Sequence, residues 1–116
     1  MKQGKKPSDP EAVLGKLLYN KTLLCIDWAR GAKKYTGGDN FAQRVGDLAS
    51  SIWDSIFVVR PEKRDKALFE RVLREQLESL DLSGFEESFE VYFIEELVND
   101  IMKGFNEIEK VIFPPL

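Results

Sequence analysis

Apolar residues in the last third of the chain alternate at steps of three and four positions. This row, called the heptad row below, consists of Val91, Ile94, Val98, Ile101, Phe105, Ile108 and Ile112. Side chains at this spacing line one side of a helix, and that side is normally buried against other helices. The row predicts a continuous helix over residues 85–113 within a helical bundle. Ser83 and Glu86 predict a capping box before it, and the prolines at 114–115 predict its end.

A second helical pattern follows a basic N-terminal arm, residues 1–8. Ser8 and Glu11 predict a capping box, and Pro10 suits the first helical turn, where its missing N–H has no partner to lose. The apolar positions of this pattern are Leu14, Leu17, Leu18, Leu24, Cys25, Trp28 and Ala32. We expect the helix to continue to about Tyr35.

Two further helices are predicted between breaks that contain glycine or proline. The glycines at 37–38 separate the first helix from the second, and Pro61 separates the second from a third helix over 62–80. The inward positions are Phe41, Val45, Leu48, Ala49, Ile52, Ile56 and Val59 in the second helix, and Leu68, Phe69, Val72, Leu73, Gln76, Leu77 and Leu80 in the third.

Four helices with short connections predict an all-α fold, an antiparallel up-down four-helix bundle over residues 9–116, with residues 1–8 as a flexible arm. A chain of 116 residues is the size of one domain, and 43% hydrophobic residues suffice for a core. Gly15, Gly31 and Gly104 lie inside the helical patterns, where glycine is costly, and so predict close helix approach.

Charge is distributed unevenly along the chain. Up to Arg74 there are 15 Lys and Arg against 9 Asp and Glu, whereas from Glu75 onward there are 2 against 11. Neighbouring antiparallel helices would neutralise part of this difference. Any remainder would form a basic face and an acidic face, which orient partners more than they stabilise the fold.

The sequence contains no histidine. Most acid–base and nucleophilic catalysis near neutral pH, and histidine-ligated metal sites, are therefore not expected. Carboxylates crowd the last helix, and Glu86 and Glu90 lie one turn apart. They favour a solvated acidic face, with a magnesium or catalytic carboxylate site as the alternative. We predict no enzyme, no cofactor and no metal site.

Cys25 is the only cysteine, which excludes an internal disulfide and suits a reducing compartment. No run approaches the ~20 apolar residues that a membrane-spanning helix needs. The prediction is a cytoplasmic protein that does not associate with membranes.

The beginning of the last helix is rich in aromatic residues. Phe85, Phe89 and Tyr92 lie there, and Trp53 lies beside the apolar side of the second helix. One interpretation is a large buried core end. The other is a surface for a protein partner or a second copy of the chain, and these four are its candidate partner-binding residues.

Basic residues concentrate at the turn between the second and third helices and along the third. Arg60, Lys63, Arg64, Arg71 and Arg74 are candidate nucleic-acid-binding residues, because such a group could neutralise phosphates. They could equally pair with the glutamates of the last helix. The acidic overall balance excludes a general nucleic-acid binder.

Residues 35–80 also resemble a known family. The pattern consists of Phe41, Arg44, Leu48, Ala49, Ile52 and Ile56, the basic turn 60–66, and Leu68, Arg71, Leu73, Leu77 and Leu80. It is similar to the four-helix-bundle family of ribosomal-RNA intervening-sequence proteins and retroelement accessory variability proteins. The resemblance implies ring-like oligomers and, for the retroelement proteins, binding of a reverse transcriptase and nucleic acid.

The sequence therefore favours a non-enzymatic adaptor or accessory protein that binds a protein partner and self-associates. The alternative is a nucleic-acid-associated accessory subunit that uses the basic turn and the third helix. Both alternatives, the partner's identity, the oligomeric state and the biological process stay open at this point.

Overall fold

The computed structural model describes residues 10–112, with side chains through residue 110. The described part is all-helical, and four long helices pack together. They are α1 (Pro10–Gly31), α2 (Asn40–Phe57), α3 (Lys66–Glu78) and α4 (Glu87–Lys103), followed by the short helix α5 (Phe105–Ile112). A 3-10 turn, Pro61–Lys63, lies between α2 and α3.

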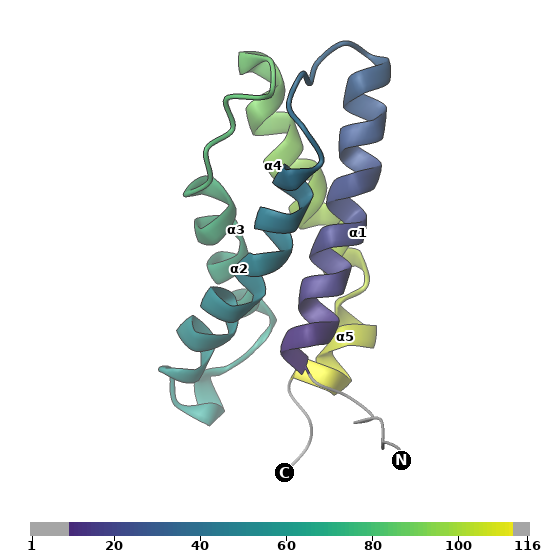
Figure 1. Cartoon of the computed structure of the whole chain (residues 1–116). Coiled ribbons are helices and arrows are strands. Elements are labelled where there is room, and N and C mark those ends of the chain that lie inside the picture. Colours follow the sequence, from purple (N-terminus) through teal and green to yellow (C-terminus); the bar gives the residue numbers. More distant parts are fainter. Residues whose placement is uncertain (1–9, 113–116) are drawn as a thin grey trace, which may run out of the picture.

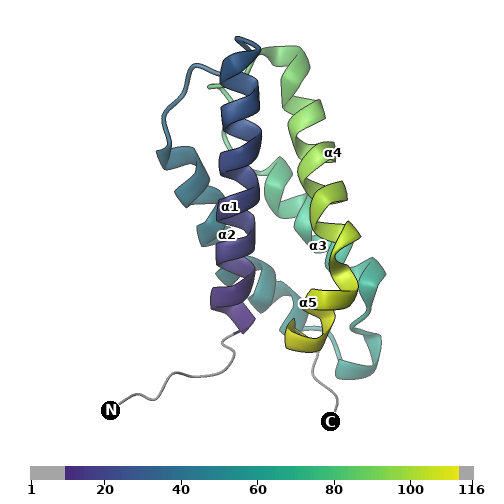
Figure 2. The same ribbon diagram turned by 90° about the vertical axis from the view of Figure 1, so that its right-hand side faces the viewer.

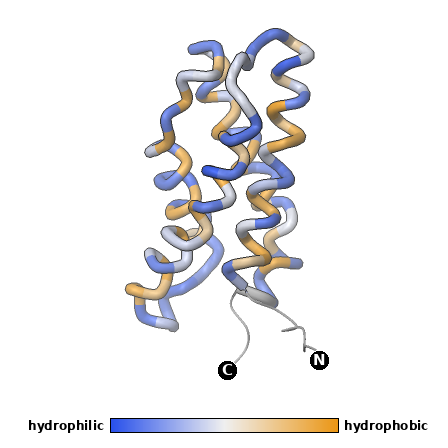
Figure 3. The backbone as a smooth tube through the Cα atoms, in the orientation of Figure 1, coloured by the Kyte–Doolittle hydropathy of each residue, from blue (hydrophilic) through white to orange (hydrophobic). Residues whose placement is uncertain are grey.

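The helices form a layered arrangement in which α1 and α4 face one side and α2 and α3 the other (Figures 1 and 2). The segments 32–39 and 79–86 meet at one end of the molecule, and α5 packs against α1 at the opposite end. Hydrophobic and hydrophilic positions alternate along every helix (Figure 3). The apolar sides of α1 to α4 therefore meet in one core.

That core contains mainly residues that the apolar patterns predicted. The largest fully buried side chains are Phe69, Phe93, Leu14, Leu18, Ile26, Ile52, Ile56, Leu73, Leu77, Leu97 and Ile101. One polar residue, Thr22, is buried among them, and its hydroxyl has no hydrogen-bond partner among the described residues.

Helices α1 and α2 approach closely where two glycines face each other. A Cβ atom at Gly46 would lie 3.1 Å from the carbonyl oxygen of Gly15, and a Cβ at Gly15 would lie 3.3 Å from that of Gly46. The expected close approach is confirmed for Gly15. It is wrong for Gly31 and Gly104: no atom lies within 4 Å of a Cβ at Gly31, and Gly104 lies between α4 and α5.

The two segments at the end of the molecule are joined by backbone hydrogen bonds. Tyr35 and Phe85 form an isolated antiparallel bridge, in which the N–H of Thr36 donates to the carbonyl of Gly84 (2.9 Å) and the N–H of Glu86 donates to that of Lys34 (2.8 Å). The bridge connects the end of α1 to the beginning of α4.

We expect a salt bridge beside this contact to make stability sensitive to acid. The Lys34 ammonium lies 2.9 Å from the Glu86 carboxylate, and its hydrogen bond, together with one from Ser88, lowers the pKa of Glu86. A carboxyl whose folded-state pKa is lowered contributes stability above its unfolded pKa of about 4.3, and loses it as the pH falls through the folded value. We expect Glu86→Gln to make the fall in unfolding free energy below about pH 4.5 less steep.

The measurement is urea unfolding followed by circular dichroism at a series of pH values. Lys34→Met should flatten the same part of the curve, because it removes the first cause of the lowered pKa. An acid dependence that neither variant alters would contradict the role of this pair.

The structure corrects the first predicted helix. The helix ends at Gly31 rather than at about Tyr35. Lys33 adopts a left-handed conformation (φ 61°), and the N–H of Lys34 donates a hydrogen bond to the carbonyl of Ala29, an arrangement that is typical of helix C-termini. The buried positions of this helix are Leu14, Leu18, Thr22, Ile26 and Ala29. Leu24, Trp28 and Ala32, three apolar positions of the predicted pattern, are exposed. Ser8, and with it the predicted capping box and arm, lies outside the described residues.

The third helix is shorter than the predicted 62–80. The Asp65 carboxylate accepts a hydrogen bond from the N–H of Leu68 (2.9 Å) and caps the N-terminus of α3, so the residues before it form a separate turn.

The Ser83–Glu86 capping box predicted before the last helix is not formed. The N–H of Ser83 donates instead to Asp81, and Glu86 precedes α4 without capping it.

The heptad row is confirmed from Ile94 to Ile108 and wrong at its beginning. Val91 is 69% exposed, whereas Phe89 and Phe93 are buried. The predicted continuous helix is also interrupted, because Gly104 separates α4 from α5. The Ile112 side chain and the prolines at 114–115 lie outside the described residues.

Candidate functional site

A groove opens between α1 and α4. Figure 2 shows the two helices side by side. Its volume is about 250 Å³, and its lining is apolar apart from one edge of carboxylates. The lining residues are Leu24, Cys25, Trp28, Phe89, Tyr92, Phe93, Glu96 and Asp100. We call this feature the α1–α4 groove.

The α1 wall of the groove is built from apolar residues that do not reach the core. Leu24 is 65% exposed and Trp28 is 58% exposed. Both lie off the line through Leu18 and Ile26 that α1 buries against the rest of the bundle. Water therefore contacts two large apolar side chains one helical turn apart, which the core does not require.

The α4 wall places aromatic rings against Trp28. The Trp28 ring lies 5.5 Å from the Phe89 ring, in a stacked arrangement, and 5.8 Å from the Tyr92 ring. The Phe89 and Tyr92 rings are 4.9 Å apart. Phe89 is buried and forms the floor, whereas Tyr92 is 46% exposed. The exposed apolar surface is thus one patch shared by the two helices, and such patches on soluble proteins mark interaction sites.

Carboxylates give the groove a negative field. Burial, together with the charges of Asp100 and Glu96, raises the pKa of the Cys25 thiol to about 11, against a smaller opposite effect of Lys21. Loss of hydration also raises the pKa of the Tyr92 phenol, with contributions from the same two carboxylates. Cys25 is therefore protonated at neutral pH and unsuited to nucleophilic chemistry.

The predicted partner-binding residues divide between the core and the surface. Phe85 and Phe89 are buried in the described structure, as the core interpretation expects, and Phe89 also lines the floor of the groove. Tyr92 lies in the groove. Trp53 is half-buried on α2, where its ring packs 4.7 Å from Phe57, and it does not line the groove.

Sequence reasoning missed Leu24 and Trp28 as site residues because it grouped all apolar positions of the first helix into one pattern. A signal was available. The two are four residues apart but do not fall on the row that contains Leu14, Leu18 and Ile26. Two apolar rows on one helix indicate either a wide core contact or a second apolar surface.

Arg74 and Arg64, two of the five predicted nucleic-acid-binding residues, are held by partners within the molecule, and a third, Arg60, forms an exposed ion pair with Glu62 (4.0 Å). Arg74 pairs with Glu95 of α4 and lies 3.7 Å from Glu70, so for this residue neutralisation of the last helix is what the structure shows. Arg64 donates to backbone carbonyls at the end of α2. Arg60, Lys63 and Arg71 are exposed.

Arg64 stabilises the turn that follows α2. Its Nε donates to the carbonyl of Val59 (2.9 Å), its Nη2 donates to that of Phe57 (3.2 Å), and its guanidinium lies 4.3 Å from the Phe57 ring centroid. We expect Arg64→Met to lower the free energy of unfolding by about 1–2 kcal/mol, since two charge-assisted hydrogen bonds and a cation–π contact are lost. Chemical denaturation measures the change.

The matched control is Arg71→Met, which removes an exposed arginine of α3 and should cost less than about 0.5 kcal/mol. Equal losses in the two variants would contradict a structural role specific to Arg64.

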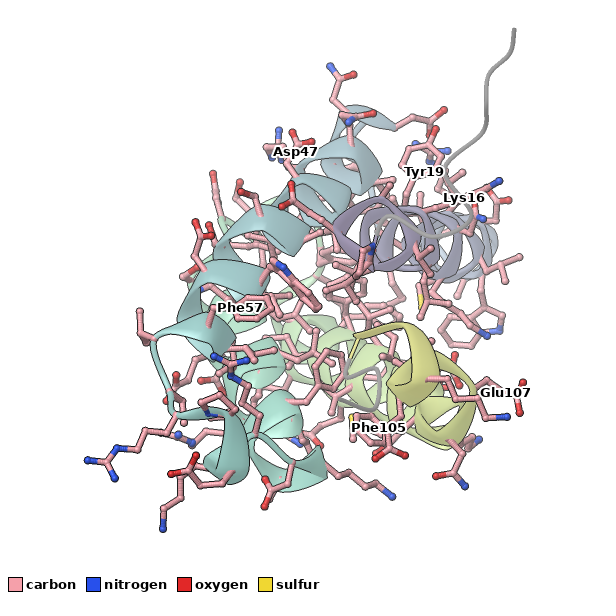
Figure 4. The ribbon with its side chains drawn as sticks, turned by 90° about the horizontal axis from the view of Figure 1, so that it is seen from below. Lys16, Tyr19, Asp47, Phe57, Phe105 and Glu107 are labelled. Carbon is pink, nitrogen blue, oxygen red and sulfur yellow. The ribbon has the colours of Figure 1, made fainter. Side chains whose placement is uncertain are left out.

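A larger but shallow depression lies between α1 and α2. It measures about 440 Å³ and has the close glycine contact, Gly15 with Gly46, at its floor. Lys16 and Tyr19 from α1 and Asp47 from α2 border it (Figure 4). Its remaining lining is mainly small or polar, so it lacks the apolar anchors of the α1–α4 groove.

Among residues 10–112, no group of three or more potential ligands is arranged to hold a metal ion. The carboxylates that the sequence suggested as a possible metal pair have a different arrangement, because Glu86 binds Lys34 and Ser88. None of the described helices is long and apolar enough to cross a membrane.

The resemblance to the intervening-sequence and accessory variability proteins stays a prediction. Comparisons of this chain with protein-family models, with curated proteins and with solved structures gave no match.

Proposed function

We propose that this protein is a non-enzymatic adaptor that docks a protein partner in the α1–α4 groove, on an antiparallel up-down four-helix scaffold. The observation that carries the proposal is the joint exposure of Leu24, Trp28 and Tyr92 over one groove. Interface hot spots are enriched in tryptophan and tyrosine that fill or border such pockets. The single cysteine, protonated at neutral pH, is compatible with a reducing, cytoplasmic setting.

The basic residues support this choice over the nucleic-acid alternative. With Arg64 and Arg74 committed to internal partners, three of the five candidate cations are left for phosphates. The pair Arg60 and Glu62, 4.0 Å apart, reduces the positive field further. A measurable, salt-sensitive affinity for DNA or RNA that Arg60→Glu with Lys63→Glu abolishes would favour the alternative instead.

The docking function is tested with a photo-crosslinking amino acid in the cells that make the protein. Placed at Leu24, it should give a discrete covalent adduct with another protein chain, and Trp28→Ala should reduce that adduct about tenfold. The adduct's mass distinguishes a different protein from a second copy, which would indicate self-association.

The control position is Val58, an 83% exposed apolar residue at the end of α2, outside the groove. Adducts that form equally from positions 24 and 58, or that persist unchanged in Trp28→Ala, would overturn the proposal. Circular dichroism of each variant verifies that it is folded.

A further inference from the structure

The size of the α1–α4 groove indicates what part of a partner enters it. Small-molecule sites usually enclose about 300–1,000 Å³. At about 250 Å³ and partly open to solvent, this groove instead fits one or two side chains of a larger molecule. The inference that follows deepens the proposed function and rests on it.

The walls of the groove restrict the backbone conformation of the partner. Both walls are α-helices, whose N–H and C=O groups bond within each helix. Among the described residues there is no β-strand with a free edge, only the isolated bridge Tyr35–Phe85, and neither of its residues lines the groove. An extended peptide therefore has no edge to pair with, and the partner must satisfy its own backbone hydrogen bonds.

The spacing of residues along the groove matches that of a partner helix lying beside α1 and α4. Leu24 and Trp28 are four residues apart on α1, as are Tyr92, Glu96 and Asp100 on α4. At about 1.5 Å per residue these positions repeat every ~6 Å, which is also the repeat of residues i and i+4 on a helix laid alongside. A polyproline II segment repeats every ~9 Å and would lose register.

Charge varies along the groove. Trp28 and Tyr92 make one end aromatic, and Glu96 and Asp100 follow toward the α5 end of α4. Neither carboxylate forms an ion pair within the part of the chain that the structure describes. Glu96 accepts a hydrogen bond from the Tyr92 hydroxyl, which leaves its negative charge, like that of Asp100, to attract a cation from outside. Lys21 on α1 offsets part of this negative field.

We propose that the α1–α4 groove accepts an amphipathic α-helix of a partner protein. This helix inserts one bulky apolar side chain between Leu24, Trp28 and Tyr92, and places a lysine or arginine one turn away beside Glu96 and Asp100.

The test is a display selection against the full-length protein with two peptide libraries. One library is built on a stable helical peptide with randomised positions on one face, and the other on a proline-rich extended peptide. The helical library should yield binders with a bulky apolar residue and a Lys or Arg four positions away. Trp28→Ala should weaken the selected peptides about tenfold, and Glu96→Gln about two- to fivefold with a stronger effect at low salt.

A charge-reversed protein makes the outcome specific. Selection against the double variant Glu96→Lys, Asp100→Lys should replace the selected Lys or Arg with Asp or Glu at the same position. Val91→Ala, in an exposed residue of α4 outside the groove, is the matched control and should leave affinity unchanged.

Proline-rich binders that depend on Trp28, helical binders whose charge does not switch, or no groove-dependent binder at all would each overturn the helix proposal. The crosslink from position 24 separates this failure from that of the proposed function. If that adduct forms while the selection fails, docking stands and the partner is not a helix of this kind.

Discussion

Phe93→Ala should lower the free energy of unfolding by about 3–5 kcal/mol. Phe93 is fully buried in α4, and its ring stacks 4.8 Å from that of Phe85 and meets Phe41 edge-on at 5.4 Å. Truncation leaves a cavity and removes both aromatic contacts, each worth about 0.5–1.5 kcal/mol. Since domains of this size are stable by about 5–15 kcal/mol, the variant should be close to unfolding.

Urea denaturation followed by circular dichroism measures this loss, and two companion variants define its cause. Phe93→Leu keeps most of the volume and should cost less than about 1.5 kcal/mol. Val91→Ala, two residues earlier, removes an exposed side chain and should change stability by less than about 0.5 kcal/mol. A larger loss for Val91→Ala than for Phe93→Ala would mean that α4 is rotated relative to the structure described.

Gly84→Ala should cost about 2–3 kcal/mol, because the bridge between the two end segments leaves no room for a methyl group. A Cβ at this position would lie 2.7 Å from Cε1 of Tyr35 and 3.2 Å from Cα of Gly37. The Tyr35 ring cannot move aside cheaply. It packs 4.5 Å from the Phe85 ring, and its hydroxyl donates to the carbonyl of Gly38 (2.7 Å).

The control for this steric effect lies in the same segment. No atom is within 4 Å of a Cβ built at Gly38, so Gly38→Ala should leave stability unchanged or raise it by less than about 1 kcal/mol. The readout is the urea midpoint together with the near-ultraviolet dichroism of the tyrosine. If Gly84→Ala unfolds at the same midpoint as Gly38→Ala, the end bridge contributes nothing measurable.

The groove shows which part of the site the sequence could reveal. The aromatic enrichment at the beginning of the last helix indicated a region of interest, and Tyr92 does lie on the surface there. Its partner across the groove, Trp28, lies in another helix. Hydrophobic spacing alone does not say which of two apolar rows on α1 meets the core, since that depends on where α2 and α4 pack.

The basic candidates illustrate the same dependence. Arg64 and Arg71 are equally basic in the sequence, and both were candidate nucleic-acid-binding residues. In the structure, the turn before α3 brings Arg64 back over the end of α2, where two carbonyls and Phe57 hold it. Whether an arginine side chain forms hydrogen bonds within the protein depends on which backbone carbonyls the fold places near it.

By itself the sequence determined the all-helical class, the number of long helices and most of the core, because apolar periodicity and helix-breaking residues are local properties of the chain. Only the tertiary structure decided the rotation of each helix and the places where helices stop, such as Lys33 and Gly104. It also decided that Leu24, Trp28 and Tyr92 meet at one surface. These features depend on contacts between residues far apart in the chain, whose energies outweigh local preferences.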